Sequence, residues 1–320
     1  MNKQLTQLVV IMIIIMPQMG VALEFGVQPR FNTGVQYYEY SQDSFSSVSN
    51  SNPNFSNAAG GLKYNDFLPF VNAGLTLFAD KLFVDLFVQY SFDGEDEDRF
   101  SNSNFLIASP PRLNSDTVIS TNSELDNDFE RLEYSVSVGY AVTDKFVLFA
   151  GYKWAKTEFE ADLREGQINA ASTNNGTRNP FLSGRFMGRL DQDIKYDGPF
   201  VGAGYVWEVG AAGALTGNIA VAFMDGNVDF DFHDITQTND MGNIRPLDLN
   251  ANLANDQNVI NLNGDTIGVS VGLTWKGFTP VDGLNYAIGV NGYRYDFDST
   301  RSTDFTETVV RLDFGVAYTF

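Results

Sequence analysis

Segment after segment of this chain alternates apolar residues with small or polar residues at a spacing of two. The pattern is clearest near the end of the chain, where Leu312, Phe314 and Val316 alternate with Asp313 and Gly315. Successive side chains of a β-strand point to opposite faces of a sheet, so each segment predicts a strand with one apolar face. Ten such segments occur, at about residues 25–37, 67–77, 82–90, 132–140, 146–154, 201–207, 215–223, 267–275, 286–290 and 310–320.

The connections between the predicted strands alternate between two lengths. Short connections such as Asp80-Lys81 and Thr143-Asp144-Lys145 join the second strand to the third and the fourth to the fifth. The intervening connections are polar stretches of roughly 20 to 40 residues, apart from a moderate one near residues 298–304. Short turns at one end, long loops at the other and an even number of strands are typical of a transmembrane β-barrel.

The composition of the polar face favours a membrane barrel over a soluble β-sandwich or lipocalin-like barrel. A water-facing surface would be rich in Lys, Glu and Thr, whereas this face is mostly Gly, Ala, Ser and Asn, which suits a crowded lumen. Aromatic residues also gather at both ends of the apolar faces, as rings at two lipid headgroup layers do. The expected fold is therefore all-β, an antiparallel up-and-down transmembrane β-barrel of ten strands. A further hairpin within residues 97–128 or 233–264 would make twelve strands.

The start of the chain has the features of an export signal. Lys3 precedes an unbroken apolar run, Leu8–Met16, and Pro17 and small residues up to Ala22 follow it. The run is too short to cross a bilayer, which takes about 20 apolar residues in a helix. We expect residues 1–22 to be a cleaved signal peptide and residues 23–320 to form the barrel.

Composition excludes several classes of function. The chain has 40 acidic and 20 basic residues, a formal net charge of −20, which argues against a nucleic-acid partner. It has no Cys and one His, which removes disulfides, thiolate metal sites, Cys nucleophiles and most imidazole metal sites. Signatures of phosphate-binding and dinucleotide-binding loops are absent too, so we expect no cofactor and no metal site.

Taken together, the leader, the ten alternating segments and the aromatic C-terminal residue resemble the Gram-negative outer-membrane β-barrel proteins. In that class the last strand is an assembly signal, and the residues that match its pattern are Leu312, Phe314, Val316, Tyr318 and Phe320. The resemblance implies a bacterial outer-membrane location with periplasmic turns and external loops. It also implies contact with outer-membrane lipids and lipopolysaccharide, and handling by periplasmic chaperones and the barrel-assembly machinery. It covers the whole mature chain, at the level of the class.

On the polar face, five acidic and five basic residues make a predicted lumen that is close to neutral. The charges singled out for the lumen are Arg30, Asp85, Arg131, Glu133, Lys153, Arg311 and Asp313. Charges in so narrow a barrel must pair or keep water. Because the first and last strands are neighbours on closure, Arg30 and Asp313 are expected to form an ion pair.

Three kinds of non-enzymatic function fit these features. The barrel could be a small porin-like pore with passive passage of small solutes, or a filled structural barrel held by salt bridges. A surface adhesin or receptor is the third, because the predicted loops are strongly acidic: residues 93–128 carry a net charge of −7 and residues 229–265 a net charge of −6. The acidic run at residues 93–98 lacks the alternating spacing of a calcium loop.

An enzyme would need a site at the outer rim. His233 lies between Asp231 and Asp234 just beyond the seventh predicted strand, where outer-membrane hydrolases of lipids or peptides place catalytic residues. No partner Ser or second acidic pair can be identified for it. We therefore expect that the protein is not an enzyme, with a rim-site hydrolase as the alternative.

Overall fold

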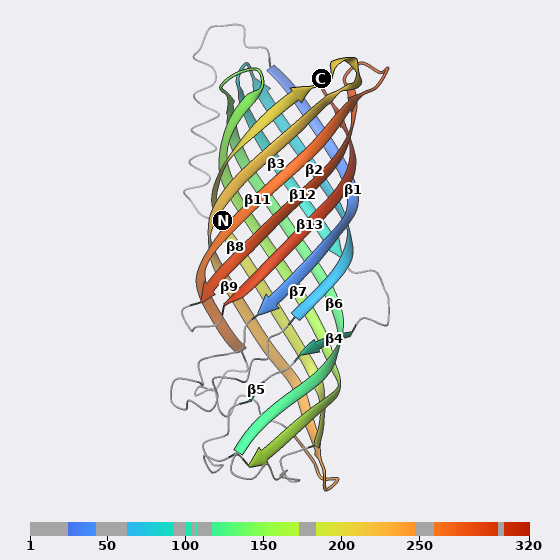
Figure 1. The fold of residues 1–320 in the computed structure, drawn as a ribbon, viewed down its shortest axis with the longest axis vertical. Coiled ribbons are helices and arrows are strands. Elements are labelled where there is room, and N and C mark those ends of the chain that lie inside the picture. The colour runs from blue at the N-terminus through green and yellow to red at the C-terminus, as the bar shows by residue number, and fades with distance from the viewer. Residues whose placement is uncertain are drawn as a thin grey trace.

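The computed structural model describes residues 25–42, 63–92, 100–103, 106–107, 117–172, 184–246, 259–299 and 304–320. The predicted signal peptide and the acidic run at residues 93–98 lie outside these residues. Almost all of the described chain is β-structure (Figure 1). Within it, no helix has the length and apolar character needed to cross a membrane.

Ten long strands form a closed antiparallel barrel (Figure 1). The strands are β1 (Phe25–Gln42), β2 (Lys63–Ala79), β3 (Leu82–Phe92), β6 (Thr117–Ala141), β7 (Phe146–Ser172), β8 (Gly184–Glu208), β9 (Ala214–Asn239), β11 (Val259–Phe278), β12 (Leu284–Ser299) and β13 (Phe305–Tyr318). Each strand pairs with its neighbours in chain order, and β1 pairs with β13 to close the sheet. The predicted ten-stranded up-and-down barrel is therefore confirmed.

The strands are strongly staggered around the barrel. A row of paired residues that starts at Gln28 in β1 passes through each of the other nine long strands in turn. It returns to β1 at Tyr40, twelve positions further along. Such a stagger requires the strands to tilt relative to the barrel axis, as Figure 1 shows.

Three short strands are additions to the barrel wall. β4 (Phe100–Ser103) and β5 (Leu106–Ile107) pair with β6, and β10 (Ile244–Pro246) pairs with β9. None of them spans the barrel, so the twelve-stranded alternative is wrong. A 3-10 turn, Gly210–Ala212, lies in the short connection between β8 and β9.

The outer face carries a continuous apolar band. Side chains such as Val201, Phe223, Val271 and Phe314 project from it with at least half of their surface exposed. In water so much exposed apolar surface would be very costly, whereas in a bilayer it contacts acyl chains. The apolar side of the predicted strands therefore faces outward.

Strands β6 to β9 continue well beyond this band, toward the long-loop end at the bottom of Figure 1. In this extension the alternation changes phase. Phe129, Phe159 and Ile194 are buried inside, while Glu130 and Lys195 are exposed outside. On the loop side the predicted strands were too short: the strand predicted at residues 132–140 began too late and the strand predicted at residues 146–154 ended too early. The change of phase interrupts the pattern by which a strand is recognised.

Candidate functional site

The interior of the barrel holds the charged side chains that could do chemistry or control passage. All seven charges singled out from the sequence lie on the inward side of their strands. Arg131 and Glu133 are the most buried of them, at 0% and 1% exposure. Conversely, the five predicted assembly-signal residues face outward: Leu312, Phe314, Val316, Tyr318 and Phe320.

Arg30 pairs with Asp85 across an intervening strand. Its Nη1 lies 2.5 Å from Asp85 Oδ1 and its Nη2 lies 2.7 Å from Oδ2, a two-point contact. Gly74, directly opposite Arg30, makes this possible, because a Cβ there would lie 2.5 Å from the guanidinium carbon. The expected pair between Arg30 and Asp313 was wrong. The register places Asp313 opposite Gly34, four residues from Arg30, so its Oδ1 accepts a hydrogen bond of 2.9 Å from Asn291 instead.

A network of ion pairs crosses the lumen near the loop-side edge of the apolar band. We call it the lumen cluster, formed by Arg131, Glu133, Lys153, Tyr293, Glu307 and Arg311. Arg131 Nε lies 2.7 Å from Glu133 Oε1, and Arg131 Nη1 lies 2.5 Å from Glu307 Oε1. Lys153 Nζ lies 2.9 Å from Glu133 Oε2. These contacts join strands β6, β7 and β13, so they link different parts of the wall.

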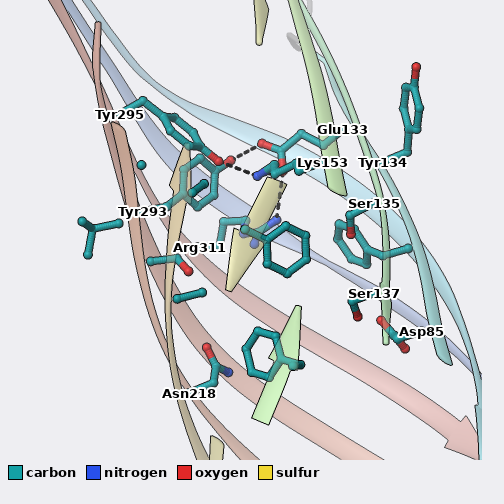
Figure 2. Close-up of a pocket in the computed structure, with 18 of the residues that line it drawn as sticks. Asp85, Glu133, Tyr134, Ser135, Ser137, Lys153, Asn218, Tyr293, Tyr295 and Arg311 are labelled. Carbon is teal, nitrogen blue, oxygen red and sulfur yellow. Dashed lines mark hydrogen bonds and ion pairs between the residues drawn. The ribbon is translucent and has the colours of Figure 1, made fainter. Parts of the chain in front are cut away.

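Tyr293 lies at the centre of the lumen cluster. Its ring is within 4.5 Å of Lys153 Nζ and within 5.0 Å of the Arg311 guanidinium, and its hydroxyl donates to Glu133. Figure 2 shows Glu133, Lys153, Tyr293 and Tyr295 converging, with Tyr134 pointing away from them. The attraction between a cation and a ring face offsets part of the free energy that the cation loses when it leaves water.

Glu307 and Tyr293 were missed from the sequence. The alternating segments were recognised only at residues 286–290 and 310–320, so both residues fell between these segments and were not assigned to a face. The polar and aromatic residues that alternate around Glu307, with Phe305 and Val309 on the same side, were the only signal. They belong to the inverted pattern that lies beyond the apolar band.

On the loop side of the lumen cluster the interior is filled by aromatic and aliphatic side chains. We call this layer the outer plug; its members are Tyr38, Tyr40, Phe129, Phe159, Ile194, Tyr196, Phe297 and Phe305, all at most 5% exposed. The rings of Tyr38 and Phe129 are 4.6 Å apart, and those of Phe297 and Phe305 are 3.9 Å apart. A cavity within the plug measures about 10 Å³, room for about one water molecule.

On the short-turn side of the lumen cluster the interior is hollow. Two cavities of about 310 and 500 Å³ share seven lining residues and together form one chamber. Arg30, Asp85 and Arg311 line both cavities, and Lys276 and Asp313 line the larger one. The lumen is thus wide on the short-turn side and closed on the loop side.

Outside the barrel, the extension carries exposed ion pairs. Arg189 Nε lies 2.8 Å from Asp191 Oδ1, and a second ion pair joins its Nη2 to Glu160. The hydrogen bond to Asp191, together with the charges of Asp191 and Glu160, raises the pKa of Arg189. His233 lies in β9 opposite Arg189, and its side chain is outside the described part of the structure. Within the described residues, no group of three or more His, Asp or Glu side chains is arranged to hold a metal ion.

Comparisons with known proteins agree with the fold. No protein-family model and no curated protein matches the sequence. Among solved structures, the outer membrane protease OmpT from Escherichia coli is similar to 94% of this chain and 99% of its own, at 10% identity and a TM-score of 0.61. The translocator domain of the autotransporter NalP from Neisseria meningitidis covers 98% and 94%, at 10% identity and a TM-score of 0.36. The similarity to OmpT, together with the closed barrel, shows that the chain has the fold of an outer-membrane β-barrel protein.

Proposed function

We propose that this protein is an outer-membrane barrel whose lumen is closed at rest, a small structural barrel rather than an open diffusion pore. The observation that carries the proposal is the pair of layers that blocks the loop side. Arg131, fully buried, bridges two carboxylates in the lumen cluster, and the packed rings of the outer plug lie next to it on the loop side. A hydrated solute would have to displace both layers.

Physical cost supports the closed state. Opening a path would separate Arg131 from Glu133 and Glu307, and breaking a buried ion pair typically costs about 3–5 kcal/mol. It would also unpack rings such as Tyr38 and Phe129. Deleting a large aromatic side chain from a protein core lowers stability by about 3–5 kcal/mol. Thermal fluctuations seldom supply the sum of these energies, so passage without a trigger should be rare.

Conductance measurements test this proposal. Purified barrel inserted into a planar bilayer should give no current steps above the baseline in 1 M salt. The variant Phe129→Ala, which leaves a hole in the outer plug, should conduct more often than the matched lipid-facing variant Phe223→Ala. Regular steps from the unaltered protein, growing with salt concentration, would show an open pore and overturn the closed-lumen proposal.

We further propose that the protein lies in the bacterial outer membrane, exported by a cleaved signal peptide, with lipopolysaccharide and lipids around its apolar band. Several observations support it: the closed apolar band, the aromatic ends of the strands and the inward polar face. Cell fractionation with N-terminal sequencing tests both parts. A chain that fractionates with soluble protein, or that keeps residues 1–22, would contradict it.

Catalysis is not part of the proposal. OmpT is a protease, but at 10% identity that similarity concerns the fold alone. We expect no hydrolysis of peptides or phospholipids by the purified barrel. A hydrolytic activity that disappears in His233→Ala, while the variant stays folded, would favour the rim-site enzyme instead.

A further inference from the structure

The chamber on the short-turn side of the lumen cluster has the lining of a binding site. Its combined cavities lie within the range of roughly 300–1,000 Å³ that small-molecule sites occupy. Five carboxamide side chains line the larger cavity: Gln28, Asn32, Asn72, Asn218 and Asn291. Three phenyl rings accompany them: Phe83, Phe87 and Phe149. Amides that both donate and accept, beside apolar ring faces, suit a ligand with hydroxyl groups and C–H surfaces.

Charge in the chamber is not balanced. Arg30 and Asp85 neutralise each other, as do Lys153 and Glu133, and Arg311 and Asp313 supply one further charge of each sign. That leaves Lys276, whose Nζ contacts the neutral Gln28 Oε1 at 3.3 Å. Among the described residues no carboxylate lies within ion-pair distance of Lys276. A half-buried ammonium without a counter-ion favours a bound anion.

Unsatisfied hydrogen-bonding capacity points the same way. Asn218 lines both cavities, and within the described residues its amide has no hydrogen-bond partner. Gly272 keeps space open beside it, because a Cβ there would lie 2.8 Å from the Asn218 amide atoms and 2.2 Å from Asn291 Oδ1. Arg311 Nε is also buried without a hydrogen-bond partner. Polar groups of this kind are normally satisfied by protein, water or ligand.

We propose that the chamber binds a small hydroxylated organic anion, the size of a sugar acid, which enters from the short-turn end. Lys276 binds the carboxylate, the carboxamides bind the hydroxyls, and the phenyl rings contact the C–H faces. The lumen cluster and outer plug close the other end, so the chamber holds its ligand without passing it through. The barrel thereby presents a solute-binding compartment toward the side where its short turns lie.

Titration calorimetry on the refolded full-length barrel in detergent tests this inference, with D-glucuronate and the neutral D-glucose as probes. Glucuronate should bind saturably, at least tenfold more tightly than glucose. Lys276→Gln should weaken glucuronate binding at least tenfold and leave glucose binding within threefold. Lys276→Arg should restore glucuronate binding to within about threefold of the unaltered protein. Lys81→Gln, an exposed turn lysine outside the chamber lining, is the matched control and should change nothing.

A measurement on the unaltered protein covers the case in which a variant does not fold. Raising NaCl from 50 to 500 mM should weaken glucuronate binding several-fold without changing glucose binding. Absence of saturable glucuronate binding, equal affinity for the two probes, or full binding by folded Lys276→Gln would each overturn the inference. The test does not involve passage through the barrel, so its failure and the failure of the closed-lumen proposal are separate results.

Discussion

Replacement of Arg131 by Met tests how the lumen is closed. The Arg131 guanidinium lies 2.5 Å from Glu307 and 2.7 Å from Glu133, and donates to Thr157 Oγ1 at 2.6 Å, with no exposed surface. Met fills much of the same volume but removes the charge. Glu133 would keep Lys153 at 2.9 Å, whereas no other cation lies within ion-pair distance of Glu307 among the described residues.

The expected cost follows from that asymmetry. Leaving Glu307 buried without its cation should lower the free energy of unfolding by about 3–5 kcal/mol. The variant Glu307→Gln should cost less, about 1–3 kcal/mol, because Arg131 keeps Glu133. Combining both substitutions should cost less than their sum by at least about 2 kcal/mol, since Glu307→Gln removes the carboxylate that Arg131→Met leaves unpaired.

Urea unfolding in lipid vesicles, followed by tryptophan fluorescence, measures these differences. Arg294→Met is the matched control, because Arg294 forms an exposed ion pair with Asp296, each about 60% exposed, whose loss should cost under about 1 kcal/mol. If Arg131→Met destabilised the barrel no more than Arg294→Met, or if the two cluster substitutions were additive, the cluster would not be a buried ion-pair network.

Two further substitutions test the wall of the barrel. Ala73 lies on the outward face of β2 within the apolar band, and Ala73→Arg should destabilise the barrel in vesicles by about 2–4 kcal/mol. Asn65→Arg, on the same face beyond the band, should lower the stability little. Equal urea midpoints for the two variants would contradict the position of the band. Asp80, in the turn between β2 and β3, has a φ of 53°. Asp80→Val should therefore lower the free energy of unfolding by about 1–2 kcal/mol, whereas Asp80→Gly should leave it unchanged or raise it. A Val variant as stable as the Gly variant would show that the turn relaxes.

The part of the fold inside the membrane could be predicted because one face of each strand contacts lipid along its full length. Residues such as Val136, Leu148 and Val271 recur at every second position on that face, so the period of two can be recognised although a few rings such as Phe149 lie on the lumen face. The extension of β6 to β9 could not be predicted in this way. There the outside meets water and the inside is packed, so the apolar residues move to the other face and the alternation breaks at residues 129–132.

Four members of the lumen cluster could be predicted from the sequence, whereas Tyr293, Glu307 and the pairing of the charges could not. That a charge on the polar face lies in the lumen follows from periodicity, which indicated Arg131, Glu133 and Lys153. Which charges pair with each other depends instead on the stagger of twelve positions and on the room that neighbouring side chains leave. Arg30 reaches Asp85 because Gly74 has no side chain to stop it, and neither the register nor that gap can be read from one sequence.

The central claim is that the apolar faces of the strands contact lipid acyl chains while the polar faces enclose a closed interior. All three tryptophans of the chain, Trp154, Trp207 and Trp275, lie on the outward faces of β7, β8 and β11. Quenching of their native fluorescence by lipids brominated along the acyl chains tests this most directly. Tryptophans that face lipid should be quenched strongly by brominated lipids and weakly by acrylamide. Tryptophans that acrylamide quenches and brominated lipids do not would contradict it.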